Sequence, residues 1–205
     1  MGFYSKYLLP KAVHFLCSSK LARQQREKVV SLATGRVLEV GIGSGLNLPL
    51  YDPEKVQRVW GLDPSLELWA MAQEAVAHAE FNLDFIKGNA EAIPLEDNST
   101  DSVLVTYTLC SVAGVLPALE EIRRVLKPGG RLVFCEHGVA PDASVQRWQD
   151  RLNPIWKKIS GGCNLNLPIP SLLKQSGFKI QQMDTMYLPG WKPATFNYWG
   201  TAGCV

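Results

Sequence analysis

The chain has 205 residues, of which 46% are hydrophobic, and its formal net charge is +2. This length and composition predict one globular domain with a single hydrophobic core. Because lysines and arginines are scattered rather than massed, we expect no basic surface for a nucleic-acid backbone and no nucleic-acid partner. The five cysteines form no CxxC pair. This argues against a disulfide framework and a zinc knuckle, so we expect a reducing, cytoplasmic setting and no metal.

The N-terminal segment is apolar but short. Residues 7–17 fall well below the roughly 20 apolar residues of a membrane-spanning helix, and no signal-peptide cleavage pattern follows them. Two interpretations stay open. In the first, the segment is a lid that excludes water from a ligand, with Tyr4 and Tyr7 as substrate-binding residues. In the second, it packs on the core or contacts a membrane surface peripherally. The sequence does not indicate an oligomeric state.

Short apolar runs alternate with amphipathic segments along the chain, which is typical of a doubly wound α/β sheet. Pro154 predicts a kink or a boundary inside one helix, and the segment 127–130 predicts a tight turn before a strand. We expect strands at 36–40, 58–62, 82–86, 102–106, 131–135, 178–186 and 195–202, and helices at 21–32, 65–79, 117–126, 144–159 and 171–176.

A glycine-rich segment follows the first predicted strand, where open α/β sheets bind ligands. Gly41, Gly43 and Gly45 lack side chains, so the backbone can turn sharply and a ligand can lie directly against it. A nicotinamide-binding fingerprint would need a glycine where Leu46 stands. Glu39 places a carboxylate just before the glycines, which suits a ligand with an ammonium and a sulfonium better than a pyrophosphate.

Two further polar positions follow the next strands. Asp63 lies about 20 residues after the glycines, where a carboxylate can accept hydrogen bonds from both ribose hydroxyls. The alternative is that Asp63 caps a helix that begins at Pro64. Asn89 follows the third strand, where its amide can bond an adenine edge or can serve as an ordinary turn residue.

Four ordered motifs resemble those of class I S-adenosylmethionine-dependent methyltransferases, of the type that includes ubiquinone-biosynthesis enzymes. The motifs are residues 39–45, 62–65, 88–94 and 125–130. The resemblance implies a seven-stranded, mostly parallel sheet with one antiparallel strand inserted near the C-terminus, and S-adenosylmethionine as the cofactor. It assigns the methionine part to Glu39, Gly41, Ser44 and Gly45, the ribose to Asp63, the adenine to Asn89 and Ala90, and the wall beside the sulfonium to Thr106, with Gly43 and Pro64 in the same site. The family usually has Asp where Asn89 stands.

The acceptor half resembles the methyltransferase-like thiol S-methyltransferases known from animal membranes. The resemblance is carried by residues 108–112, 135–137, 153–156, 162–165 and 198–200. It implies a small thiol or hydrosulfide as the methyl acceptor. That group has an N-terminal membrane anchor, which we do not expect in this chain. We expect a single domain in which residues 1–34 form a helical lid or cap, 35–136 the cofactor-binding core, and 137–205 the acceptor-side helices and terminal hairpin.

Methyl transfer needs an acceptor lone pair in line with the methyl–sulfur bond, in a site shielded from water. A thiol acceptor must first become a thiolate, so a base with a pKa near neutrality would help. His137, just past the fifth strand, is the candidate catalytic base, and a structural histidine bonded to a backbone carbonyl is the alternative. Cys110 and Trp148 are candidate substrate-binding residues, with core packing as the alternative for each.

Three functions stay open at this point. The first is S-methylation of a small-molecule thiol or hydrosulfide, which the segments 109–112 and 162–165 favour. The second is N-methylation of a phospholipid amine or C-methylation of a quinone precursor, which would use the same cofactor motifs. The third is a catalytically silent domain that binds the cofactor as a sensor, against which the intact Glu39, Gly41 and Asp63 argue.

Overall fold

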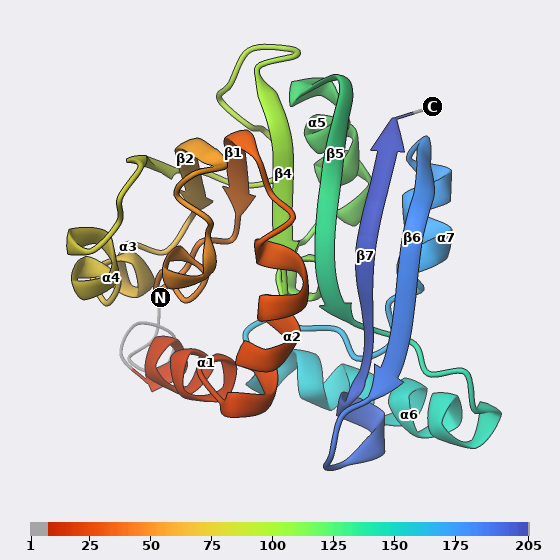
Figure 1. Ribbon diagram of the computed structural model, residues 1–205. Coiled ribbons are helices and arrows are strands. Elements are labelled where there is room, and N and C mark those ends of the chain that lie inside the picture. Colours follow the sequence, from red (N-terminus) through yellow and green to blue (C-terminus); the bar gives the residue numbers. More distant parts are fainter. Residues whose placement is uncertain (1–7, 205) are drawn as a thin grey trace.

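The computed structural model describes residues 8–204 and contains a seven-stranded sheet in the order β3-β2-β1-β4-β5-β7-β6 (Figure 1). Neighbouring strands from β3 to β5 in that order are parallel, whereas β7 is antiparallel to both β5 and β6. The predicted doubly wound sheet with one inserted antiparallel strand is confirmed. The strands are β1 (Gly35–Val40), β2 (Val56–Asp63), β3 (Asn82–Lys87), β4 (Thr100–Thr106), β5 (Leu126–His137), β6 (Phe178–Tyr187) and β7 (Phe196–Cys204).

Helices cover both faces of the sheet, and each face has its own buried apolar cluster. Leu119 and Leu173, from α5 and α7, pack on one face, and Val29 and Val30 of α2 pack on the other. In the central strands β1, β4 and β5, alternate residues supply the two clusters, as the two-residue period of a strand requires. The helices are α1 (Leu9–Cys17), α2 (Lys20–Val30), α3 (Leu66–Trp69), α4 (Gln73–Ala77), α5 (Val115–Val125), α6 (Ala143–Ile159) and α7 (Ile169–Gln175), with short 3-10 helices η2 (Leu48–Leu50), η3 (Leu109–Ser111) and η4 (Lys192–Ala194).

Two helices, α1 and α6, run across the end of the sheet where the parallel strands finish (Figure 1). The sheet's other end carries no comparable pair of helices in that view. Ligands of open α/β sheets bind at the carboxyl ends of the strands, so these two helices border the expected site. Within residues 8–204, no helix has the length and apolar character needed to span a bilayer.

The structure departs from the expected elements at three places. The helix expected over 65–79 is two helices, because the backbone N–H groups of Met71 and Ala72 bond carbonyls three residues back and tighten the chain there. The expected turn over 127–130 is present as an irregularity inside β5 rather than before it: Leu126 pairs with Thr100, Arg131 pairs with Ser102, and Gly129 between them has a φ of 80°. Helix α6 continues through Pro154 to Ile159, so no boundary falls at that proline.

Gln149 of α6 is fully buried and connects three segments on the acceptor side. Its Nε2 lies within 3.0 Å of the carbonyl oxygens of Gly138, Leu165 and Pro193, and its Oε1 accepts a hydrogen bond from the Ala140 N–H at 3.0 Å. Buried backbone polar groups need such partners, because leaving one unpaired costs the full desolvation of that group. One side chain therefore fixes the chain after β5, the chain before α7 and the chain before β7.

Replacing Gln149 with leucine tests this connection. The change keeps the side-chain size but removes the two amide protons shared among three carbonyl oxygens and the acceptor of the Ala140 N–H, each lost partner costing about 1–3 kcal/mol. We expect the free energy of unfolding, measured by urea denaturation, to fall by about 3 kcal/mol or more. Gln175→Leu, at an exposed position of α7, is the control and should leave the stability nearly unchanged. Equal midpoints for the two variants would contradict the assignment.

Candidate cofactor and acceptor site

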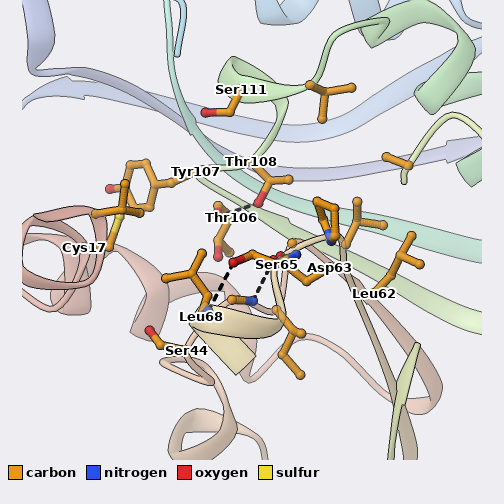
Figure 2. Close-up of a pocket in the computed structure, with 18 of the residues that line it drawn as sticks. Cys17, Ser44, Leu62, Asp63, Ser65, Leu68, Thr106, Tyr107, Thr108 and Ser111 are labelled. Carbon is orange, nitrogen blue, oxygen red and sulfur yellow. Dashed lines mark hydrogen bonds between the residues drawn. The ribbon is translucent and has the colours of Figure 1, made fainter. Parts of the chain in front are cut away.

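A cavity of about 890 Å³ opens at the carboxyl ends of β1, β2 and β4. Its volume is in the range of small-molecule and cofactor sites. Figure 2 shows Ser44 and Ser111 on opposite sides of this cavity, with Thr106 and Tyr107 between them. The sequence-predicted cofactor residues that line it are Glu39, Gly41, Gly43, Ser44, Asp63, Pro64, Asn89, Ala90 and Thr106.

The glycines after β1 have different roles. All three have positive φ values, of 77° at Gly41, 52° at Gly43 and 72° at Gly45. A Cβ on Gly41 would lie 2.2 Å from Oγ1 of Thr108, so only glycine lets β1 and the chain after β4 approach this closely. A Cβ on Gly43 would meet no atom nearer than 3.9 Å and would occupy cavity space. Gly45 does not line the cavity and instead packs against Ala72.

Asp63 ends β2 with its carboxylate buried at the cavity wall. Oδ2 accepts the Gly43 N–H at 2.9 Å and Oδ1 accepts the Ser65 N–H at 2.8 Å. Burial raises the pKa of the Asp63 carboxyl, and these two hydrogen bonds partly oppose the shift. The N-cap of α3 is Ser65, whose Oγ accepts the Leu68 N–H, so Asp63 is not the residue that caps this helix (Figure 2).

Glu39 is almost completely buried at the end of β1 and also lines the cavity. Asn47 Nδ2 donates to Oε1 at 2.9 Å, and the Tyr51 hydroxyl donates to Oε2 at 2.7 Å. Burial raises the pKa of the Glu39 carboxyl from 4.5 to about 7, although both hydrogen bonds act in the opposite direction. Asn47 Nδ2 also donates to Oγ1 of Thr106 at 2.9 Å, which joins the ends of β1 and β4.

The adenine-side residues Asn89 and Ala90 lie in the chain after β3 and line the cavity together with Gly88 and Glu91. Oε1 of Glu91 accepts the Gly114 N–H at 3.0 Å, which ties this chain to the start of α5. The backbone around Asn89 is therefore held in place by a neighbouring helix start.

The N-terminal helices supply cavity residues that the sequence did not single out. His14 Nδ1 lies 2.7 Å from Oγ of Ser44, which places α1 directly over the glycine turn. Cys17 and Arg26 also line the cavity, and the Arg26 guanidinium lies 5.1 Å from the centre of the Tyr107 ring. Tyr4 and Tyr7, expected in the substrate pocket, lie outside the described residues.

The opposite wall comes from segments after β4 and after α6. Ser111, Val112, Ala113, Ser160 and Gly161 line it. These are small residues, so they leave room beside the cofactor turn for a second, small molecule. Ser111 and Val112 belong to the segment 108–112 that resembles thiol S-methyltransferases, whereas no local motif marks Ala113, Ser160 or Gly161.

A backbone irregularity lies at the same wall. Tyr107 has a φ of 53°, an uncommon value for a non-glycine residue. Its hydroxyl donates to Oδ1 of Asn197 at 2.7 Å, and its ring packs beside Arg26. Such strained backbone persists where the surroundings fix it, and it gathers at functional sites.

The remaining predicted acceptor residues do not line the cavity. His137 ends β5 and directs Nε2 at Sγ of Cys163, 3.2 Å away. Cys110 is buried in η3. A hydrogen bond with Cys110 lowers the pKa of the Cys163 thiol. A hydrogen bond with His137 lowers this pKa further, whereas burial raises it. Trp148 is exposed on α6 and borders a separate small pocket together with Trp191.

The cavity fits S-adenosylmethionine on the chemistry of its lining. Two buried carboxylates, Glu39 and Asp63, face a space that opens beside a glycine turn. An ammonium and a sulfonium are positive, so carboxylates stabilise them, and ribose hydroxyls can donate to carboxylate oxygens. Each of the four oxygens has one protein donor and keeps a lone pair for a ligand.

Known proteins resemble this chain along most of its length. The sequence pattern of a family described as a methyltransferase domain matches residues 38–134. Human thiol S-methyltransferase TMT1B is 33% identical over 202 residues, which cover 95% of this chain and 82% of that protein. A demethylmenaquinone methyltransferase of Shouchella clausii is 35% identical over 139 residues, which cover 66% of this chain and 59% of that protein.

Solved structures agree with the fold. The crystal structure of an S-adenosylmethionine-dependent methyltransferase from Thermotoga maritima matches with a TM-score of 0.67 at 22% sequence identity, covering 98% of this chain and 97% of that one. The family match and the identity to human TMT1B identify the enzyme class, and the solved structure shares its fold. The chain belongs to the S-adenosylmethionine-dependent methyltransferases.

Proposed function

We propose that this methyltransferase transfers its methyl group to the sulfur of a small thiol or hydrosulfide. The similarity to human thiol S-methyltransferase TMT1B carries the proposal, because it extends over 95% of the chain and so includes the acceptor-side segments. The similarity to the demethylmenaquinone methyltransferase stops at 66% of the chain. The relative that matches over the acceptor-side segments is therefore the one named for a thiol substrate.

The roles proposed for the cofactor residues follow from their free lone pairs. Asp63 holds the ribose hydroxyls and Glu39 holds the ammonium of the methionine part, while Gly43 leaves the backbone open along the turn. Bound S-adenosylmethionine supplies a methyl group on a positively charged sulfur. The protein contributes by positioning the acceptor in line with that methyl group and by excluding water.

The acceptor is proposed to lie against the small side chains of Ser111, Ala113 and Gly161. Helix α1 closes the same cavity through His14 and Cys17, which shields the reacting atoms from solvent. Because the wall is built from small residues and the cavity is about 890 Å³, it accommodates the cofactor together with a compact acceptor.

Removing the Asp63 carboxylate should weaken cofactor binding. Asp63→Ala loses the charge-assisted hydrogen bonds to the ribose, worth about 1.5–3 kcal/mol, so calorimetry should give about a ten- to hundredfold higher Kd for S-adenosylmethionine. Asp184→Ala, at an exposed position of β6, is the matched control and should bind as wild type does. Equal affinities for the two variants would remove the proposed ribose role.

The pH dependence of binding tests the role of Glu39. With a pKa of about 7, this carboxyl is mostly protonated near pH 6, and an ammonium binds the ionised form better. The affinity for S-adenosylmethionine should therefore rise about five- to tenfold from about pH 6 to about pH 7.5, with a proton released on binding. Glu39→Gln should show a flat profile, and exposed Glu54→Gln should keep the wild-type slope. A slope that survives in Glu39→Gln would rule out this role.

A panel of acceptors tests the substrate class. The enzyme is incubated with S-adenosylmethionine labelled in its methyl group and with small thiols, hydrosulfide, phosphatidylethanolamine or a demethylated quinone. We expect label on the thiols and hydrosulfide. Transfer only to the amine or the quinone carbon would overturn the thiol proposal, and binding of the cofactor without transfer to any acceptor would favour a cofactor-binding domain without catalysis.

A further inference from the structure

Three soft donor side chains meet beside the acceptor wall. They are Cys110 in η3, His137 at the end of β5, and Cys163 in the chain between α6 and α7. Their Sγ, Nε2 and Sγ atoms all lie within 4.8 Å of one another, and the closest printed approach is 3.2 Å between His137 Nε2 and Cys163 Sγ. Neither the fold nor the cofactor site requires this combination.

The donor set matches the preferences of Zn²⁺. Zinc binds thiolate sulfur at about 2.3 Å and imidazole nitrogen at about 2.1 Å in tetrahedral geometry, which places donors about 3.5–3.8 Å apart. The three atoms are close to that spacing, so small side-chain rotations bring them onto one ion. Catalytic zinc sites have three protein ligands and an open fourth position, whereas structural sites have four.

The surrounding hydrogen bonds hold the cluster together. Both the backbone N–H and the Nδ2 of Asn164 donate to the carbonyl oxygen of Cys110, at 2.8 and 2.9 Å. The Leu165 N–H donates to Oδ1 of Asn153 at 2.8 Å, which fixes the chain just after Cys163 to α6. Ordered backbone around each ligand is what a site with a defined geometry requires.

The local charge also favours a cation. Glu136 is fully buried next to His137, and its Oε1 accepts the N–H groups of Thr108 and Leu109, at 2.7 and 3.1 Å. Its Oε2 has no hydrogen-bond partner among the described residues. A buried carboxylate without a full set of partners is costly, and a divalent cation beside it would offset that cost.

The cluster adjoins the cofactor cavity. Cys110 directly precedes Ser111, which lines the cavity, and Cys163 follows Gly161, which also lines it. The Cys163 thiol is only partly buried. The three side chains therefore lie directly behind the acceptor-side wall of the cavity.

We propose that Cys110, His137 and Cys163 bind a Zn²⁺ ion whose open fourth position takes the sulfur of the methyl acceptor. The role of that fourth position depends on the proposed thiol function, whereas the metal site itself does not. The bound thiol loses its proton to solvent and stays on zinc as a thiolate. Its lone pair forms the new sulfur–carbon bond while the bond from the methyl carbon to the sulfonium breaks, giving S-adenosylhomocysteine and a thioether that leaves the metal.

Metal content tests the site directly. Full-length protein is purified without chelators from zinc-supplemented cells, and zinc is measured by mass spectrometry with Cys110→Ser, His137→Gln, Cys163→Ser and the exposed control Cys204→Ser. We expect about one zinc per chain in wild type and in Cys204→Ser, and loss of zinc in the other three. Calorimetric binding of S-adenosylmethionine reports whether each variant is folded.

A cobalt titration tests the geometry and the open position. Co²⁺ added to metal-free wild type should give the visible bands of tetrahedral thiolate-bound cobalt, and hydrosulfide or a small thiol should shift them. Bands that do not respond would overturn the open position.

The outcomes separate the two proposals. If metal binding depends on Cys110, His137 and Cys163 but no S-methyl transfer occurs, the zinc site is supported and the proposed thiol function is overturned. If zinc-free protein transfers methyl groups to sulfur and chelators do not affect the reaction, the zinc site is overturned and the thiol function is supported. A disulfide between Cys110 and Cys163 in protein purified under reducing conditions would also overturn the zinc site.

Discussion

The cofactor cavity depends on the close approach of β1 and the chain after β4 at Gly41. A side chain there would overlap Thr108, and the strand end could then not turn away from the sheet at that point. The sharp turn also brings Asn47 and Tyr51 back onto Glu39. The hydrogen bonds that hold this buried carboxylate therefore depend on the close approach at Gly41 as well. Backbone sterics at one residue thus determine both the shape of the cavity and its charge.

The sheet provides one side of the site, and segments from both ends of the chain provide the rest. His14 reaches Ser44 from α1, and Ser160 and Gly161 approach from the end of α6. The cofactor side is built from consecutive strand ends and is common to the family fold, whereas the acceptor side is assembled from distant segments.

The sequence predicts the sheet well, and most of the cofactor residues that it singles out line one cavity, because strand alternation and glycine spacing are local signals. It does not predict the break between α3 and α4, which rests on hydrogen bonds at Ala72. Nor does it indicate the meeting of His137 with Cys163, since those residues are 26 positions apart and show no metal-ligand spacing. The contact of His14 with Ser44, 30 positions apart, is equally a product of tertiary folding.

The buried Gln149 has a consequence for how this enzyme can diverge. It bonds the chain just after His137, the chain just after Cys163 and the chain before β7 through one side chain. An insertion or deletion in any of these three loops would displace an atom that the other two need. Natural variation in acceptor preference should therefore accumulate as side-chain replacements along the cavity wall, with loop lengths preserved wherever the glutamine is retained.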